Sequence, residues 1–235
     1  MSSWTARRFW TTASAVPVEG GFTVHLDARP VRTPLKAPLV VPTLALAEAV
    51  AAEWQAQEKT VNPETMPFTR TANSAIDKVM PQFAAVADML AEYGGSDLLC
   101  YRAEGPADLV ALQARHWDPI LDWARAELGA DLTRTTGVMH VAQPETSLET
   151  LRAHVHALSA FQLSAFHDLV AITGSLVLAL AVARGRLTAE AAWALSRVDE
   201  DWQISLWGED EEAAESAALK RAALLQADRF FALCG

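Results

Sequence analysis

The fold is decided between residues 19 and 30, in the stretch Glu19-Gly20-Gly21-Phe22-Thr23-Val24-His25-Leu26-Asp27-Ala28-Arg29-Pro30. Apolar and polar residues alternate between its glycines and its proline, and this period of two is typical of a strand with one buried face. Glycine, aspartate and proline on both sides are turn formers. Further short extended runs stand at residues 8–12 and 39–41. The pattern predicts a small antiparallel β-meander.

Helical periodicity begins directly after this meander. Thr43 is a good N-cap, and the apolar residues that follow it fall on one face of a helix that we expect to end near Gln57. Two further helices are expected at residues 68–79 and 81–93. The meander and these helices predict a small α+β domain over residues 1–104.

The rest of the chain, residues 105–235, is predicted to be an all-α domain. A helix that begins at Pro106 meets Pro119, which has no backbone N–H to donate, so we expect a kink or a restart there with Asp118 as the cap. Residues 130–144 are expected to form a loop or one short strand pair. The remaining helices are expected at residues 145–158, 161–183 and 188–207, and from the acidic turn at 209–212 to Phe231.

Composition and charge exclude several classes of protein. The chain has 235 residues, of which 51% are apolar and 20% charged, the range of globular proteins. With 19 basic against 29 acidic residues and no basic cluster, nucleic acid is not an expected partner. The apolar run at residues 169–183 is shorter than the ~20 residues that span a membrane, so no insertion is expected. Cys100 and Cys234 lie far apart and no secretory signal precedes the first strand, which indicates a reducing compartment, the bacterial cytoplasm.

Motifs that carry chemistry are missing from the sequence. It contains neither a phosphate-binding glycine motif nor a nucleophile motif. His154 and His156 would point about 200° apart on a helix, so they cannot chelate one metal together. His167 beside Asp168 is more simply interpreted as a locally satisfied helix residue than as a catalytic one. We therefore expect no catalytic residue, no metal ligand and no cofactor.

The helix expected between Thr188 and Trp207 carries two unlike faces on a helical wheel. One face holds the apolar residues Leu195, Val198, Trp202 and Leu206, which are expected to face the core. The other face, which we call the Glu200 stripe, consists of Trp193, Ser196, Glu200, Gln203 and Trp207. Two interpretations of this stripe stay open. Either the helix is central and Glu200 pairs with an arginine, or the stripe is a protein-binding surface with tryptophan hot spots.

Short motifs along nearly the whole chain carry a further signal. In the first half they are Arg8-Phe9-Trp10, Gly20-Gly21-Phe22, Leu26-Asp27-Ala28-Arg29, Thr33-Pro34, Glu53-Trp54 and Leu99-Cys100-Tyr101-Arg102. In the second half they are Trp117-Asp118-Pro119-Ile120, Leu195-Ser196-Arg197, Glu200-Asp201-Trp202-Gln203-Ile204 and Trp207-Gly208. Their order and spacing resemble a family of assembly chaperones that hold the α subunit of the F1 sector of ATP synthase before it joins the hexamer.

The resemblance implies a chaperone that works without ATP hydrolysis, not an enzyme, and it implies the same two-part fold. It also implies that the acidic position carried here by Glu200 matters for function, and that Trp54 matters for the fold or for client binding. Members of the family from mitochondria, where the place of action is the matrix, carry an extension before the Arg-Phe motif. This sequence lacks it, so the bacterial cytoplasm is the expected location.

The resulting hypothesis is that the Glu200 stripe, together with Trp54, binds the unassembled α subunit, masks its β-facing surface and prevents its aggregation until assembly. The free chaperone is expected to be a monomer. Two alternatives stay open. One is a hydrolase that uses the carboxylates of Asp199 to Asp201 with His167. The other is a small-molecule carrier with an apolar pocket along Leu169 to Ala183.

Overall fold

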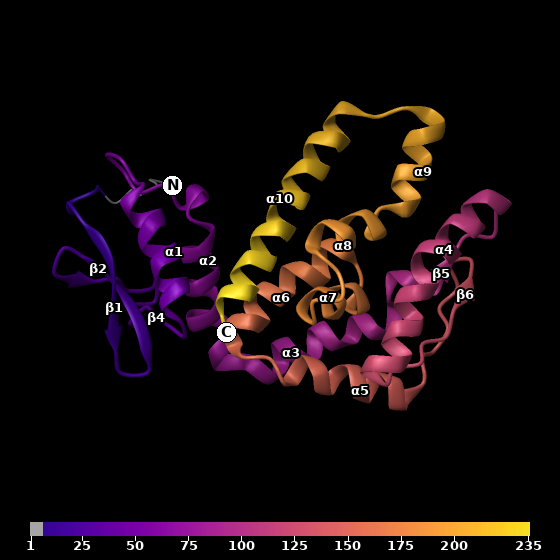
Figure 1. Cartoon of the computed structure of the whole chain (residues 1–235), viewed down its shortest axis with the longest axis horizontal. Coiled ribbons are helices and arrows are strands. Elements are labelled where there is room, and N and C mark those ends of the chain that lie inside the picture. Colours follow the sequence, from indigo (N-terminus) through magenta and orange to yellow (C-terminus); the bar gives the residue numbers. More distant parts are fainter. Residues whose placement is uncertain (1–6) are drawn as a thin grey trace. The chain divides into compact units, whose positions relative to one another are not determined.

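The computed structural model describes residues 7–235, and these residues form two compact units (Figure 1). The first unit contains the described residues up to Phe83, with residues 159–165 and 229–235. The second contains residues 84–158 and 166–228. The units thus differ from the two continuous domains expected, 1–104 and 105–235. Residues 1–6, the start of the expected N-terminal domain, lie outside the described residues.

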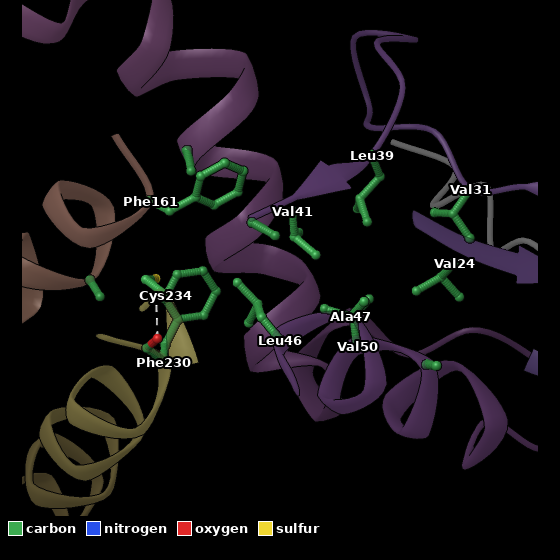
Figure 2. Packing of buried hydrophobic residues seen from close by; sticks show 14 of the residues in the cluster. Val24, Val31, Leu39, Val41, Leu46, Ala47, Val50, Phe161, Phe230 and Cys234 are labelled. Carbon is green, nitrogen blue, oxygen red and sulfur yellow. Dashed lines mark hydrogen bonds between the residues drawn. The ribbon is translucent and has the colours of Figure 1, made fainter. Parts of the chain in front are cut away.

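Two helices that contribute to both units explain this difference. Helix α6 (Ala160–Thr173) begins with Phe161, and helix α10 (Glu211–Leu233) carries Phe230 near its end. Both phenylalanines are buried in the hydrophobic core of the first unit, as Figure 2 shows. Burial of these two rings attaches segments from the second half of the chain to the N-terminal core. A domain boundary drawn at one position of the sequence cannot include such segments.

The sheet of the first unit is built around β2 (Gly21–Leu26), as the alternating pattern predicts. β2 pairs antiparallel with β1 (Ala13–Val18), β3 (Arg29–Pro30) and β4 (Val40–Val41). The antiparallel meander is thereby confirmed. The extended run expected at residues 8–12 is not one of its strands, because the N–H groups of Thr11 and Thr12 donate to the Asp27 carboxylate instead of to a ladder.

The glycine that opens β2 is required by the close approach of β4. Gly21 has φ +152°, and a Cβ built on it would lie 2.3 Å from the Val41 carbonyl oxygen. No side chain avoids this contact, because the oxygen belongs to the backbone of the neighbouring strand. The Gly-Gly pair before the strand therefore has a structural reason.

Gly21→Ala is expected to lower the free energy of unfolding by about 3 kcal/mol, because the strands must move apart to admit the methyl group. Urea denaturation measures the loss. Gly20→Ala is the matched control. Gly20 also has a positive φ, but a Cβ there would meet no atom within 4 Å, so only about 1 kcal/mol of backbone strain is expected. Equal losses in the two variants would contradict the argument.

The helices of the first unit are held by side-chain caps. Helix α1 (Leu44–Gln55) begins where expected, since the Thr43 hydroxyl oxygen accepts a hydrogen bond of 3.2 Å from the Leu46 N–H. A short 3-10 turn at Pro63–Thr65 precedes helix α2 (Pro67–Ser74), which passes into a π turn at Ala75–Val79. The Glu53 carboxylate accepts from the Phe68 and Thr69 N–H groups at the start of α2. Burial of Glu53 raises the pKa of this carboxyl group above its usual range.

The second unit is mainly helical. Its helices are α3 (Phe83–Ala91) after its first residue, α4 (Ala107–Trp123), α5 (Glu145–His156), most of α6, α7 (Leu176–Ala183), α8 (Ala189–Ser196), α9 (Val198–Trp207) and most of α10. In the segment expected to be a loop or a strand pair, β6 (Thr135–Thr136) pairs in parallel with β5 (Tyr101–Arg102). The α+β fold class with a helical C-terminal region is confirmed. Among the described residues, no helix is both long and apolar enough to cross a membrane.

Two predicted helices of this region have other bounds. Helix α4 continues through Pro119 without a restart, and Asp118 is not a cap but an ion-pair partner of Arg102. Pro119 is exposed, so the carbonyl that it leaves without a donor lies on the solvent side. The long helix expected at 161–183 is interrupted at Gly174, which has φ +66°. A residue in this left-handed conformation ends α6, and the Ser175 hydroxyl caps α7 by accepting from the Leu178 N–H at 3.0 Å.

Candidate functional site

The single helix expected from Thr188 to Trp207 is two helices, α8 and α9, so the helical wheel drawn for one continuous helix is wrong. Thr188 caps α8 as predicted, its hydroxyl oxygen accepting from the Ala191 N–H at 3.1 Å. Helix α8 ends at Ser196, whose hydroxyl donates to the Trp193 carbonyl at 2.8 Å. Arg197, with φ −111° and ψ 13°, joins it to α9. A hydroxyl that bonds back to its own helix weakens that helix and often bends it, and no glycine or proline stands at this position.

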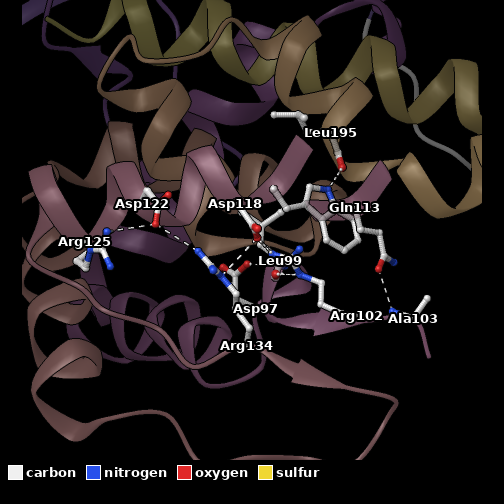
Figure 3. A network of polar contacts seen from close by, with 11 residues as sticks. Asp97, Leu99, Arg102, Ala103, Gln113, Asp118, Asp122, Arg125, Arg134 and Leu195 are labelled. Carbon is white, nitrogen blue, oxygen red and sulfur yellow. Dashed lines mark hydrogen bonds and ion pairs between the residues drawn. The ribbon is translucent and has the colours of Figure 1, made fainter. Parts of the chain in front are cut away.

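Two side chains of helix α4 hold the junction between α8 and α9 in place. Trp117 is fully buried, and its Nε1 donates to the Leu195 carbonyl at 2.8 Å. Gln113 is also buried, and its Nε2 donates to Asp199 Oδ1 at 2.6 Å while its Oε1 accepts from the Ala103 N–H at 2.9 Å. Figure 3 shows Gln113 and Leu195 in this network. Asp199 therefore holds the start of α9 in place.

Helices α8, α9 and α10 line a groove of about 540 Å³, all within the second unit. Four residues of the Glu200 stripe line it: Trp193, Glu200, Gln203 and Trp207. Ser196 does not line the groove, because it is buried and its hydroxyl is bonded to Trp193. The structure thus brings most of the stripe together, although the helix on which it was drawn is broken.

The opposite wall of the groove comes from α10, a helix that no pattern within residues 188–207 indicates. We call this wall the alanine face; it consists of Ala213, Ala214, Ala217 and Ala218. These residues follow one another at the spacing of a single helix face, and Arg221 extends it by one turn. In the sequence, the recurring alanines at the start of α10 are the feature that indicates this face.

Helix α9 leaves the core after its first turn. Val198 is its buried residue, while Trp207 is 85% exposed and Leu206 57% exposed. Leu206 was expected to face the core, and this expectation is wrong. Gly208, at φ +87°, ends the helix and begins the turn to α10. A large aromatic side chain in this position is a candidate contact for another protein.

The groove carries an excess of negative charge. Its lining contains the carboxylates of Glu200, Asp201, Glu209 and Asp210 and the guanidinium groups of Arg197 and Arg221. Both arginines have partners. Arg197 lies 3.3 Å from Asp201 Oδ1 and 5.2 Å from the Trp193 ring centroid, and Arg221 binds both oxygens of Glu190. Within the described residues Glu200 makes no ion pair, so the interpretation that pairs it with an arginine is wrong.

Trp54 lies in the first unit and is not among the residues that line the groove. Its ring packs edge to face on Trp10, with 5.3 Å between centroids, and Arg8 lies 5.5 Å from the Trp10 ring. Two motifs that carry the family resemblance, Arg8-Phe9-Trp10 and Glu53-Trp54, thus meet at the hydrophobic core. The contacts of Trp54 support a role in the fold.

The histidines have separate local partners. His154 Nε2 lies 3.1 Å from the Leu128 carbonyl, whereas His156 Nε2 lies 2.6 Å from Asp88 Oδ1. His167 Nδ1 lies 2.9 Å from the neighbouring Asp168, and this contact raises the pKa of His167 above its usual value. The local satisfaction expected for His167 is confirmed. In the part of the chain that the structure describes, no three metal-binding side chains gather.

The apolar run proposed as a carrier pocket is packed into the core of the second unit. Residues 176–182, which form nearly all of α7, are each at most 7% exposed. These side chains fill the interior of the unit, which is the ordinary role of a helix that is apolar on all sides.

Comparison with known proteins gives consistent matches. The model of the ATP12 chaperone protein family matches residues 7–125. The mitochondrial protein atp12 of Schizosaccharomyces pombe is 27% identical over 223 residues, which cover 89% of this chain and 76% of that protein. The crystal structure of Atp12 from Paracoccus denitrificans is 54% identical with a TM-score of 0.95, covering 98% of this chain and 99% of that one. A mutant of P. denitrificans Atp12p is 53% identical with a TM-score of 0.96, covering 98% of both chains.

Proposed function

Because this chain belongs to the ATP12 chaperone family, we propose that it holds the unassembled α subunit of the F1 sector of ATP synthase until assembly. It does so by masking the β-facing surface of that subunit, which would otherwise aggregate. The observation that carries this proposal is the groove of the second unit, where Glu200 and Trp207 are both exposed on α9. The family is one of chaperones and not of enzymes.

Exposed apolar side chains on α9 and α10, of which Trp207 lines the groove, support a protein partner. Trp207, Leu206 and Leu219 are 85%, 57% and 74% exposed, and all three belong to α9 or α10. Tryptophan beside a polar rim is typical of binding hot spots. A specific complex of ordinary size buries about 1,600 Å² in total, so the contact would extend beyond the groove.

Release of the client would follow from competition by the β subunit for the same surface. Nucleotide hydrolysis is not part of the proposal, since the sequence contains no phosphate-binding glycine motif. We place this activity in the bacterial cytoplasm, because the solved structures that share about half of its residues come from the bacterium P. denitrificans. The free chaperone is proposed to be a monomer.

Glu200→Lys is expected to weaken binding of the purified α subunit at least tenfold. Glu200 is exposed and makes no ion pair in the described part of the chain, so the substitution reverses a charge of the groove without breaking a contact of the fold. Titration calorimetry with a tagged chaperone measures the affinity, and thermal unfolding shows whether the fold is kept.

Glu215→Lys is the matched control for the same charge change. Glu215 is exposed on α10 but is not among the residues that line the groove. We expect its affinity to stay within twofold of the original. The role given to Glu200 is wrong if the two variants bind the α subunit equally well while both remain folded.

A further inference from the structure

We infer that the groove receives an α-helix of the client that carries lysine or arginine, and that the alanine face of α10 is the surface that admits it. This inference rests on the proposed function and names the chemistry of the bound segment. We infer the bound segment from three features of the groove: the shape of its two walls, the hydrogen bonding of their backbone groups, and the charges of the residues that line it.

The first half of α10 buries no side chain against the rest of the unit, although its Arg221 makes an ion pair with Glu190 of α8. Residues 211–223 contain no buried residue, whereas Leu224, Ala227 and Phe230 further along the same helix are buried. A helix in a folded protein normally buries one stripe along its length. On the face toward the groove, residues 213–218 of α10 present alanine side chains, and small side chains allow another helix axis to approach closely.

The facing wall has anchors at helical spacing. Glu200, Gln203, Ile204 and Trp207 occupy positions i, i+3, i+4 and i+7 of α9, and all four line the groove. Such a face, set opposite a face of small residues, has the geometry in which one helix lies between two others. Most lining residues are exposed, so the groove is open along its length and can accept a segment of chain.

The backbone of the walls excludes an extended peptide. A strand binds by pairing its N–H and C=O groups with the free edge of a sheet. The walls here are helices, whose backbone groups along α9 and α10 are already bonded within each helix. An extended segment would leave its own backbone groups against tryptophan and alanine side chains, whereas a helix satisfies them internally.

The charges of the groove select a basic helix. Its two arginines are held by Asp201 and Glu190, so they add no free positive charge. Glu200 and Glu209 have no ion-pair partner within the described residues; Glu200 lies in the first turn of α9, and Glu209 lies two residues beyond its end. A lysine or arginine on the bound helix can pair with each, and partial removal from water strengthens such pairs.

Ala217→Trp is the variant that fills the groove without changing its charge. We expect it to weaken binding of the purified, unassembled α subunit at least tenfold. Ala223→Trp is the matched control, because Ala223 is exposed on the same helix and does not line the groove. Its affinity is expected to stay within twofold. Both substitutions have the same small effect on helix propensity, and circular dichroism verifies that α10 is retained.

A photo-cross-linking residue in place of Gln203 identifies the occupant. We expect it to label a segment of the α subunit that is helical in the folded subunit and carries at least two lysine or arginine residues. A synthetic peptide of that segment should bind the original chain and not Ala217→Trp, and its affinity should fall as salt is raised.

The outcomes separate this inference from the proposed function. If the original chain binds the α subunit and Ala217→Trp binds it equally well, or if the label falls on a strand or an acidic segment, the helix-in-groove inference is overturned and the proposed function stands. Labelling of a second copy of this chain also overturns it. If the original chain does not bind the α subunit, the proposed function fails and the inference fails with it.

Discussion

Replacing Asp97 with alanine is expected to destabilise the protein by about 5 kcal/mol near pH 4 and about 3 kcal/mol near pH 7. The Asp97 side chain is fully buried and accepts three hydrogen bonds. Oδ1 accepts from the Leu99 N–H at 3.0 Å and from the Ser175 hydroxyl at 2.8 Å, and Oδ2 accepts from the Val177 N–H at 2.9 Å. Alanine leaves these buried donors without an acceptor, at about 1 to 3 kcal/mol each.

The pH dependence follows from the environment of the same carboxyl group. Burial raises the pKa of Asp97 to about 6 from an ordinary value of 3.8, and the hydrogen bonds from Val177 and Ser175 offset only part of this effect. The folded state therefore binds a proton more tightly than the unfolded state. The stability that this proton contributes is fully present below the unfolded pKa and is lost as the pH rises through about 6. The change between pH 4 and pH 7 is about 2 kcal/mol.

Urea denaturation of the original chain and of Asp97→Ala at several pH values measures both effects. The difference between the two chains isolates Asp97 from the other groups that titrate in this range. Glu149→Ala is the control, since Glu149 is exposed on α5 and its removal should leave the profile unchanged. A difference that grows with pH would show that Asp97 is stabilised as a carboxylate and would contradict the argument.

Local signals in the sequence were sufficient where a residue and its partner lie close together. The Thr43 and Thr188 caps each depend on a backbone N–H three residues away, and both form as predicted. The strand at Gly21–Leu26 depends on alternation within six residues. These features need no knowledge of the rest of the fold, because their geometry is set by neighbouring dihedral angles.

Features that depend on distant partners were not visible in the sequence. Asp97 is buried because Ser175 and Val177 lie against it, and nothing near Asp97 indicates a partner so far along the chain. The break at Arg197 is held by Gln113 and Trp117 of α4. A helical wheel assumes an unbroken helix, so it placed Leu206 in the core, although this residue is exposed.

Only part of the candidate site was predicted, because the other part comes from a helix distant in the sequence. The wheel grouped Trp193, Glu200, Gln203 and Trp207 correctly because the two short helices still carry them toward one groove. It could not supply the alanine face of α10, which comes from another helix. The family motifs are explained by contacts: Leu99-Cys100-Tyr101-Arg102 meets Trp117-Asp118-Pro119-Ile120 through a single side chain, that of Arg102.

Replacing Arg102 with methionine is expected to destabilise the protein by about 3 kcal/mol, because three contacts are lost together. The Arg102 side chain is 10% exposed, and its guanidinium group lies 5.2 Å from the Trp117 ring centroid. Its Nε donates to the Leu99 carbonyl at 2.9 Å and a terminal nitrogen donates to Asp118 Oδ1 at 2.8 Å (Figure 3). Methionine keeps much of the apolar stem but has no group to donate.

Arg134→Met is the matched control, since Arg134 binds the same Asp118 oxygen at 3.4 Å with a side chain that is 43% exposed. A salt bridge at the surface contributes less than about 1 kcal/mol, so this variant should unfold close to the original. Similar losses in the two variants would mean that the charge on Asp118, and not the buried position of Arg102, decides the stability.

The Arg102 substitution also tests whether α4 positions the groove. The guanidinium group lies against the Trp117 ring, and the Nε1 of that ring holds Leu195 at the end of α8. A shift of the ring would move the α8–α9 junction, which carries Trp193 and Glu200. We therefore expect folded Arg102→Met to bind the α subunit more weakly, while Arg134→Met binds normally. Measured well below the unfolding transition, an unchanged affinity would show that α4 supports the fold without setting the groove, because loss of stability alone does not alter the affinity of the molecules that remain folded.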